Sequence, residues 1–178
     1  SAVVSLVQGD VRFMPVEVQE TVDPVRVKEL SLRADSGGAG KFRGGLGVVM
    51  EREVLGPCDY NGRYERTKDA PWGFHGGLPG KVTTSEVRRA TGAIEKLPLK
   101  CERFQFKQSD AEIVYTAGGG GYGSAWERDA VAVLADVRNG YISVNAAKQD
   151  YGVSINSESW QVNAAETERL RAAMRATK

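Results

Sequence analysis

The 178-residue chain has 24 basic and 23 acidic side chains, a net charge of +1 and 41% hydrophobic residues. This length suits one domain with at most an appendage, and the balanced charge argues against electrostatic binding to nucleic acid or to a membrane surface. With only two cysteines, no apolar run of membrane-spanning length and no signal peptide, we expect a cytoplasmic protein with two reduced thiols.

Up to about residue 116 the pattern is typical of short β-strands. The chain opens in strand-like sequence at residues 1–4, as a piece of a larger protein would. Apolar and polar residues alternate partially over residues 11–18 and more fully over residues 25–32. Clusters of glycine and proline separate these runs from the further strand candidates, which are residues 48–55, 82–89, 103–106 and 111–115.

The pattern becomes helical after Gly123. Apolar spacing predicts a helix over residues 127–137, which ends before an Asn-Gly pair. Ser143 is a candidate N-cap for a short helix that ends before Gly152, and Asn163 is a candidate N-cap for a last helix through about residue 176.

These elements predict an α+β protein. We expect a glycine-rich, mainly β, sandwich- or barrel-like domain over residues 1–125. A small helical appendage, residues 126–178, is expected to pack on it.

The glycine-rich loops resemble two nucleotide-binding patterns but fail both. Residues 118–123 contain G-x-G-x-x-G after a strand, but the interval to Asp136 has room for only one of the two elements that a dinucleotide-binding fold requires there. A P-loop ending at Gly40-Lys41 would require a glycine where Asp35 stands and a hydroxyl where Phe42 stands. We therefore interpret the 116–123 loop as a structural connection, with a place at the edge of a shared active site as the alternative.

No complete active site is visible in the residues themselves. His75 is the only histidine, so a metal site or a catalytic triad would lack its usual second partner, and we expect no metal site in this chain. The acidic residues Asp35, Asp110, Asp129 and Asp136 are expected to lie in turns and caps or on the solvated surface.

Four blocks, in order, resemble the hydantoinase B/oxoprolinase family. They are DSGGAGKFRGGLG at residues 35–47, PWGFHGGLPG at 71–80, GGGGYG at 118–123, and the run from residue 127 to 153. Departures from the family pattern, at Ser109, Ala117 and Ala125, affect turn geometry rather than chemistry.

The resemblance implies an ATP-dependent enzyme made of two kinds of subunit or fused half. The hydantoinase A-type half would bind ATP and phosphorylate an amide or carbonyl oxygen, and the B half would help to hydrolyse hydantoin, oxoproline or a similar lactam. Related members carboxylate acetone or acetophenone instead, and a non-catalytic assembly module is a further alternative.

The resemblance covers only the C-terminal part of the B half, so we expect this chain to be inactive alone. Its expected partners are the A-type subunit and the N-terminal part of its own subunit, in a hetero-oligomer. ATP and a divalent metal are expected in the rest of the enzyme, with no cofactor in this chain.

If residues of this chain reach a shared site, the candidates are Asp35, Arg43, His75, Tyr122 and Arg128. Arg43 and Arg128 suit bidentate binding of a phosphorylated intermediate or a carboxylate, and a salt bridge or cap is the alternative for each. The glycines expected to serve structural loops are Gly37, Gly38, Gly40, Gly44, Gly45, Gly118, Gly119, Gly120 and Gly121.

Overall fold

The structure, a computed structural model, describes residues 14–176, which form two compact units. The sheet unit comprises Ser1–Leu32 (described from residue 14), Val48–Asp69 and Val82–Thr116. The glycine–helix unit comprises Arg33–Gly47, Ala70–Lys81 and Ala117–Lys178 (described to residue 176). The predicted division into domains 1–125 and 126–178 stays a prediction.

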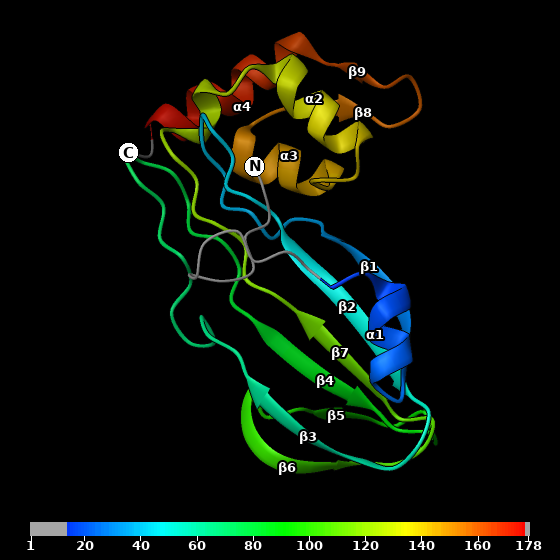
Figure 1. The fold of residues 1–178 in the computed structure, drawn as a ribbon. Coiled ribbons are helices and arrows are strands. Elements are labelled where there is room, and N and C mark those ends of the chain that lie inside the picture. Colours follow the sequence, from blue (N-terminus) through cyan, green and yellow to red (C-terminus); the bar gives the residue numbers. More distant parts are fainter. Residues whose placement is uncertain (1–13, 177–178) are drawn as a thin grey trace. The chain divides into compact units, whose positions relative to one another are not determined.

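The sheet unit contains helix α1 and a five-stranded sheet in the order β1-β2-β7-β4-β5 (Figure 1). The central strand, β7, pairs antiparallel with both β2 and β4 and buries four of its five residues. The bounds are α1 (Val16–Val22), β1 (Val25–Arg33), β2 (Gly47–Val54), β4 (Thr84–Arg88), β5 (Ile94–Lys96) and β7 (Ala111–Tyr115).

A second, two-stranded sheet in the same unit pairs β3 (Cys58–Arg63) with β6 (Lys100–Phe106) in antiparallel fashion. Side chains from both sheets share one hydrophobic core, in which Phe106 of β6 and Val87 of β4 are almost completely buried. Burial of such side chains away from water is the main force that holds two sheets together. The core consists of Val54, Val87, Leu97 and Phe106, with Cys58, Tyr60 and Phe104 packed against it.

The glycine–helix unit carries the remaining helices, whose ends follow from their capping residues (Figure 1). The Ser143 hydroxyl accepts a hydrogen bond from the Ala146 amide, and Gly152 ends the same helix in the left-handed conformation. Asn163 caps the last helix through the Glu166 amide. The bounds are η1 (Ala125–Glu127), α2 (Ala130–Arg138), α3 (Val144–Tyr151), β8 (Ile155–Asn156), β9 (Gln161–Val162) and α4 (Ala164–Ala176).

The helices of this unit enclose a core of their own. Val133 of α2, Ala147 of α3 and Val153 are all fully buried within it. Ala39, from the glycine-rich segment 33–47, belongs to the same core. The helices and the glycine-rich backbone therefore fold as one body.

The predicted α+β class is confirmed, with an open sheet in place of a closed barrel among the described residues. The strand predicted over residues 11–18 is wrong in the part that the structure describes, residues 14–18, because α1 begins at Val16. Pro15 sets φ near −53° and its carbonyl accepts from the amides of Val18 and Gln19, which starts a helical turn. Residues 1–4 and 11–13 lie outside the described part of the chain. The helix predicted from residue 127 begins later, at Ala130, because Asp129 is its N-cap.

Candidate functional site

Three glycine-rich segments of the glycine–helix unit, residues 36–47, 70–81 and 117–123, lie backbone against backbone and form what we call the glycine layer. The third segment is hydrogen-bonded to both others: the Gly38 amide donates to the Gly119 carbonyl at 2.8 Å, and the Gly121 amide donates to the Leu78 carbonyl at 2.9 Å. The first and second segments also meet, through the Leu78 amide and the Ala39 carbonyl at 2.7 Å.

The glycine layer has no room for side chains between its segments. A Cβ added at Gly118 would lie 1.9 Å from the Ser36 carbonyl oxygen, and one added at Gly120 would lie 1.8 Å from that of Trp72. Real Cβ atoms do not approach oxygen so closely, so these positions require glycine for close backbone approach rather than for an unusual φ. The loop 118–123 is thus packed, backbone against backbone, on both other segments of the glycine layer.

Two candidate residues, Arg43 and Arg128, meet at one carboxylate. Arg43 Nε donates to Asp136 Oδ2 at 3.1 Å, and Arg128 Nη2 donates to the same oxygen at 2.8 Å. Their other bonds go to backbone carbonyls of the glycine layer, from Arg43 to Gly44 and from Arg128 to Lys41. All three side chains are largely buried. The two arginines therefore tie α2 to the glycine layer, and much of their hydrogen-bonding capacity is already used.

Tyr151 of α3 adds a buried hydroxyl to the core of the same unit. Its ring is 1% exposed, and neither its hydroxyl nor Arg128 Nε has a hydrogen-bond partner among the described residues. Burial raises the pKa of Tyr151 to about 12, against the opposing positive charge of Arg128. The phenol therefore stays neutral at physiological pH.

Asp35 lies at the start of α3, not at the arginine pair. Its Oδ1 accepts from the Ser143 amide at 2.7 Å, and its own amide donates to the Tyr141 carbonyl at 3.1 Å. Asp35 also adopts a positive φ of 57°, which aspartate tolerates better than most residues. Its contacts are those of a turn residue that secures a helix start.

The remaining candidates, His75 and Tyr122, belong to an exposed group of rings, Phe42, Phe74, His75 and Tyr122, which we call the aromatic cluster. Tyr122 lies between the other two segments, with its backbone bridged to both Phe42 and Phe74. Ring centroids are 5.2 Å apart for His75 and Tyr122 and 6.2 Å apart for Phe42 and Tyr122. About half or more of the Phe42, Phe74 and Tyr122 side chains lies in solvent, with exposed fractions of 62%, 59% and 48%.

The sheet unit contains a buried polar network that sequence reasoning missed. Glu112 of β7 is 3% exposed, accepts from Arg52 Nε at 2.7 Å and accepts from the Tyr64 hydroxyl at 3.3 Å. The Tyr60 hydroxyl donates to that of Tyr64 at 3.3 Å, and burial, with the nearby charge of Glu112, raises the pKa of both phenols. Arg52 of β2 and Glu112 of β7 lie opposite each other in the register of the two strands. The sequence signal for this network was Arg52 itself, an arginine within an otherwise apolar strand face.

Three members of this network, Arg52, Tyr60 and Glu112, line a cavity of about 220 Å³ within the sheet unit. Its wall also includes the apolar side chains of Pro24, Val54 and Phe106. Both carboxylate oxygens of Glu112 are already occupied, so the network is arranged as a buried structural ion pair, with no free base facing a ligand.

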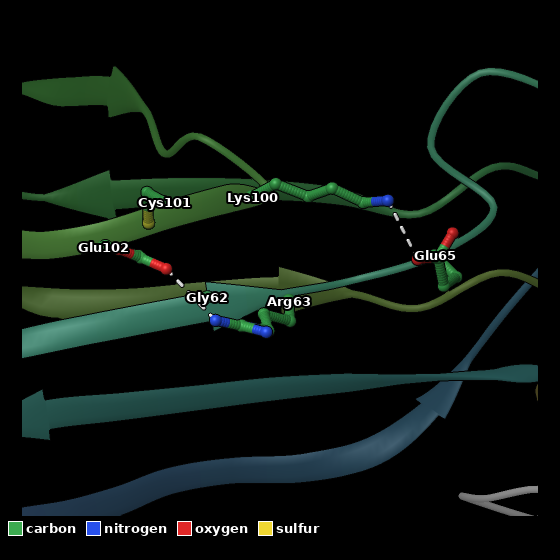
Figure 2. Close-up of a pocket in the computed structure, with 6 residues that line it drawn as sticks. All are labelled: Gly62, Arg63, Glu65, Lys100, Cys101 and Glu102. Atoms are coloured by element: carbon green, nitrogen blue, oxygen red, sulfur yellow. Dashed lines mark hydrogen bonds and ion pairs between the residues drawn. The ribbon is translucent and has the colours of Figure 1, made fainter.

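A larger hollow, of about 530 Å³, is lined by residues of β3 and β6 and by Glu65. Figure 2 shows the residues that line it. Its charged side chains form two exposed ion pairs, between Arg63 and Glu102 at 3.1 Å and between Lys100 and Glu65 at 2.9 Å. Exposed pairs of this kind contribute little energy and no fixed geometry. The hollow is therefore a feature of the solvated surface.

Among residues 14–176, no three His, Cys, Asp or Glu side chains gather where they could hold a metal ion. The described residues thus offer no ligand set for a divalent metal, and the metal that the resemblance implies in the rest of the enzyme stays a prediction. None of the helices in this range is long and apolar enough to cross a membrane.

A sequence profile described as hydantoinase B/oxoprolinase matches residues 1–125. The chain is 38% identical over 160 residues to an uncharacterized protein of Methanocaldococcus jannaschii, a match that covers 88% of this chain and 28% of that protein. It is 31% identical over 169 residues to a putative D-/L-hydantoinase B subunit of a Pseudomonas species, covering 94% of this chain and 28% of the relative.

Two solved structures share the fold. The ATP-dependent caprolactamase of Pseudomonas jessenii matches with a TM-score of 0.72 and 32% identity, over 89% of this chain and 28% of the solved one. Nucleotide-free acetone carboxylase matches with a TM-score of 0.80 and 24% identity, over 92% of this chain and 26% of that one. The chain thus spans little more than a quarter of the length of these four proteins.

Proposed function

Because the chain belongs to the hydantoinase B/oxoprolinase family, we propose that it serves as the C-terminal part of a hydantoinase B-type subunit. The whole enzyme would be an ATP-dependent hydrolase of hydantoin, oxoproline or a similar lactam. The observation that carries this proposal is the similarity to a putative hydantoinase B subunit and to a caprolactamase over about nine-tenths of this chain.

The chemistry explains why such an enzyme needs ATP. An unstrained amide is a poor electrophile, because its nitrogen lone pair is delocalised onto the carbonyl. Phosphorylation of the amide oxygen would make the ring carbon more electrophilic, so that water adds to it. The ring C–N bond would then break as the nitrogen takes up a proton, and a second water would hydrolyse the resulting acyl phosphate to the carboxylate and inorganic phosphate. In this proposal ATP and the metal belong to the rest of the enzyme, with the A-type subunit as the ATP-binding partner.

The role of this chain in the proposal is to build and support a site that it does not complete. Four of the five candidate residues, Arg43, His75, Tyr122 and Arg128, lie on or against the glycine layer. The layer is held by backbone hydrogen bonds and by the double ion pair at Asp136. Such a support keeps side chains in one geometry, which a shared active site requires.

A carboxylase is the second candidate, because the chain is also 26% identical, over 94% of its length, to the alpha subunit of an acetone carboxylase. The identity to the caprolactamase is higher, at 32%. We therefore place the hydrolase first.

The test uses the natural polypeptide that carries this sequence, purified together with the ATP-binding protein that accompanies it. ADP formation and ring opening are measured with hydantoin, 5-oxoproline and caprolactam, each with and without ATP. The proposal expects ring opening of one of them only with ATP, and none from the 178-residue chain alone. ATP-dependent consumption of bicarbonate with acetone, without ring opening, would establish the carboxylase instead. If no ADP forms with any of these substrates, both proposed reactions are contradicted.

A further inference from the structure

We infer that the aromatic cluster, Phe42, Phe74, His75 and Tyr122, is the surface on which the remaining part of a hydantoinase B-type subunit packs. The inference rests on the proposed function, since it requires this chain to act as part of a longer subunit. It adds to that function which surface of this chain contacts the rest of the subunit, and what kind of side chain makes that contact.

The cluster is a fixed surface rather than a set of loose side chains. Tyr122 and Phe42 exchange two backbone hydrogen bonds, at 2.9 and 3.0 Å, and the Phe74 amide donates to the Gly121 carbonyl at 2.8 Å. The Phe74 and His75 rings meet edge to face, with centroids 4.4 Å apart. A surface of this rigidity loses little conformational entropy when a partner covers it.

The cluster exposes more apolar surface than single scattered side chains would. Taking about 200 Å² for each aromatic side chain, the exposed fractions of Phe42, Phe74 and Tyr122 leave on the order of 300 Å² in contiguous contact. That is in the range of the largest patch on a typical monomer, and such patches commonly mark interaction sites. Gly121 and Gly123 flank Tyr122, and Gly73 precedes Phe74, so these positions carry no side chain that could cover the rings.

The chemistry of the cluster favours a neutral, apolar partner surface over an anion such as a nucleotide. The four side chains include no carboxylate and no permanent cation. The two cationic residues that flank Phe42 in sequence are already paired, Arg43 with Asp136 and Lys41 with Glu127. Apolar aromatic surface of this kind suits a permanent interface more than a transient one.

The identity of the occupant follows from chain length. The solved caprolactamase chain aligns with this chain over only 28% of its length, so most of that polypeptide lies outside the matched part. A segment joined to this one by the backbone meets the cluster at a high effective concentration, which a separate subunit lacks. We therefore assign the cluster to the rest of the same subunit rather than to the A-type subunit.

Photo-crosslinking tests this assignment in the assembled enzyme. p-Benzoylphenylalanine replaces Phe42 in the full natural polypeptide, an exchange of one exposed aromatic side chain for another, and in a second preparation it replaces Phe74. The control carries the same group in place of Val131, which is 67% exposed on α2 and lies outside the cluster. Cross-linked peptides are then identified by mass spectrometry.

We expect both cluster positions to cross-link to the same region of the subunit, outside these 178 residues, with a yield at least about tenfold above that of the control. Cross-links to the A-type subunit, to a second copy, to another part of the 178 residues, or at the control level would overturn the inference. A natural polypeptide with only 178 residues would overturn it as well.

The unsubstituted enzyme is assayed for ATP-dependent ring opening, which separates the two proposals. An enzyme that opens no ring, while its substituted forms cross-link as expected, contradicts the proposed reaction and leaves the interface standing. An enzyme that opens a ring, while its substituted forms cross-link elsewhere, contradicts only the interface.

Discussion

The hydrophobic core of the sheet unit and the glycine layer of the other unit are packed in different ways. In the sheet unit, large side chains such as Phe106 and Leu97 fill the space between two sheets. In the glycine layer, backbone packs on backbone, and an added Cβ at Gly118 would lie within 1.9 Å of a carbonyl oxygen. The first arrangement is sensitive to the removal of atoms and the second to their addition. Each prediction below tests one side of this contrast.

The largest effect is expected from Gly118→Ala. The new methyl group would overlap the Ser36 carbonyl, and relief would require two backbone segments to separate, so we expect a loss of about 4 kcal/mol or more, or failure of the unit to fold. Urea denaturation followed by circular dichroism measures the loss. Gly56→Ala is the matched control, since its Cβ would have no atom within 4 Å, and it should be neutral or slightly stabilising. Equal effects of the two changes would refute close packing in the glycine layer.

In the sheet unit, Phe106→Ala should cost about 3–4 kcal/mol, because it removes a ring that is 2% exposed and leaves a cavity. The same denaturation experiment measures it. Ile94→Ala is the control, since that side chain is 63% exposed on β5 and should cost well under about 1 kcal/mol. A small loss for Phe106→Ala would mean that the two sheets of this unit do not share a core.

Much of the fold was predictable because its signals are local. The ends of α3 and α4 follow from Ser143, Gly152 and Asn163, which act on amides only a few residues away. Five strands overlap runs of strand-like sequence. The strands β3, β5, β8 and β9 were missed, because they carry many polar residues and are strands only through the strands beside them.

The arrangement of the candidate residues could not be predicted from the sequence. Arg43 and Asp136 are 93 positions apart, and no local pattern indicates that they pair. Their contact depends on how the glycine layer packs against α2, which is set by non-local backbone contacts. The same holds for the aromatic cluster, whose rings come from all three segments of the layer. Whether the candidate residues act in a shared active site stays a prediction.

Buried carboxylates offer a pH test in the sheet unit. Burial disfavours the charged form of Asp110, but hydrogen bonds from the Lys107 and Ala90 amides and from Arg89 outweigh it and hold its pKa below the ordinary value. A lowered pKa in the folded state stabilises the protein above the unfolded pKa of about 3.9, and this contribution is lost as the pH falls through the folded value.

We therefore expect Asp110→Asn to cost about 2 kcal/mol at pH 7, and the difference from wild type to shrink as the pH falls below about 4. Urea titrations of both proteins between pH 7 and pH 3 measure it, and the comparison cancels the effects of other carboxyl groups. A difference that stays constant across this range would contradict the assigned role.

The smallest effect, of opposite sign, is expected from Tyr151→Phe in the glycine–helix unit. The ring is 1% exposed and packed in the helical core, and its hydroxyl has no hydrogen-bond partner among the described residues. Removal of the hydroxyl keeps the packing and relieves an unsatisfied polar group, so the free energy of unfolding should be unchanged or rise by up to about 1 kcal/mol. Thermal unfolding of the variant measures this, with Tyr64→Phe as the comparison, because the Tyr64 hydroxyl donates to buried Glu112 and its loss should destabilise. A clear loss from Tyr151→Phe would show that this hydroxyl is satisfied by a bound water or by another group in the assembled enzyme, and that polar contacts contribute to this core along with its apolar side chains.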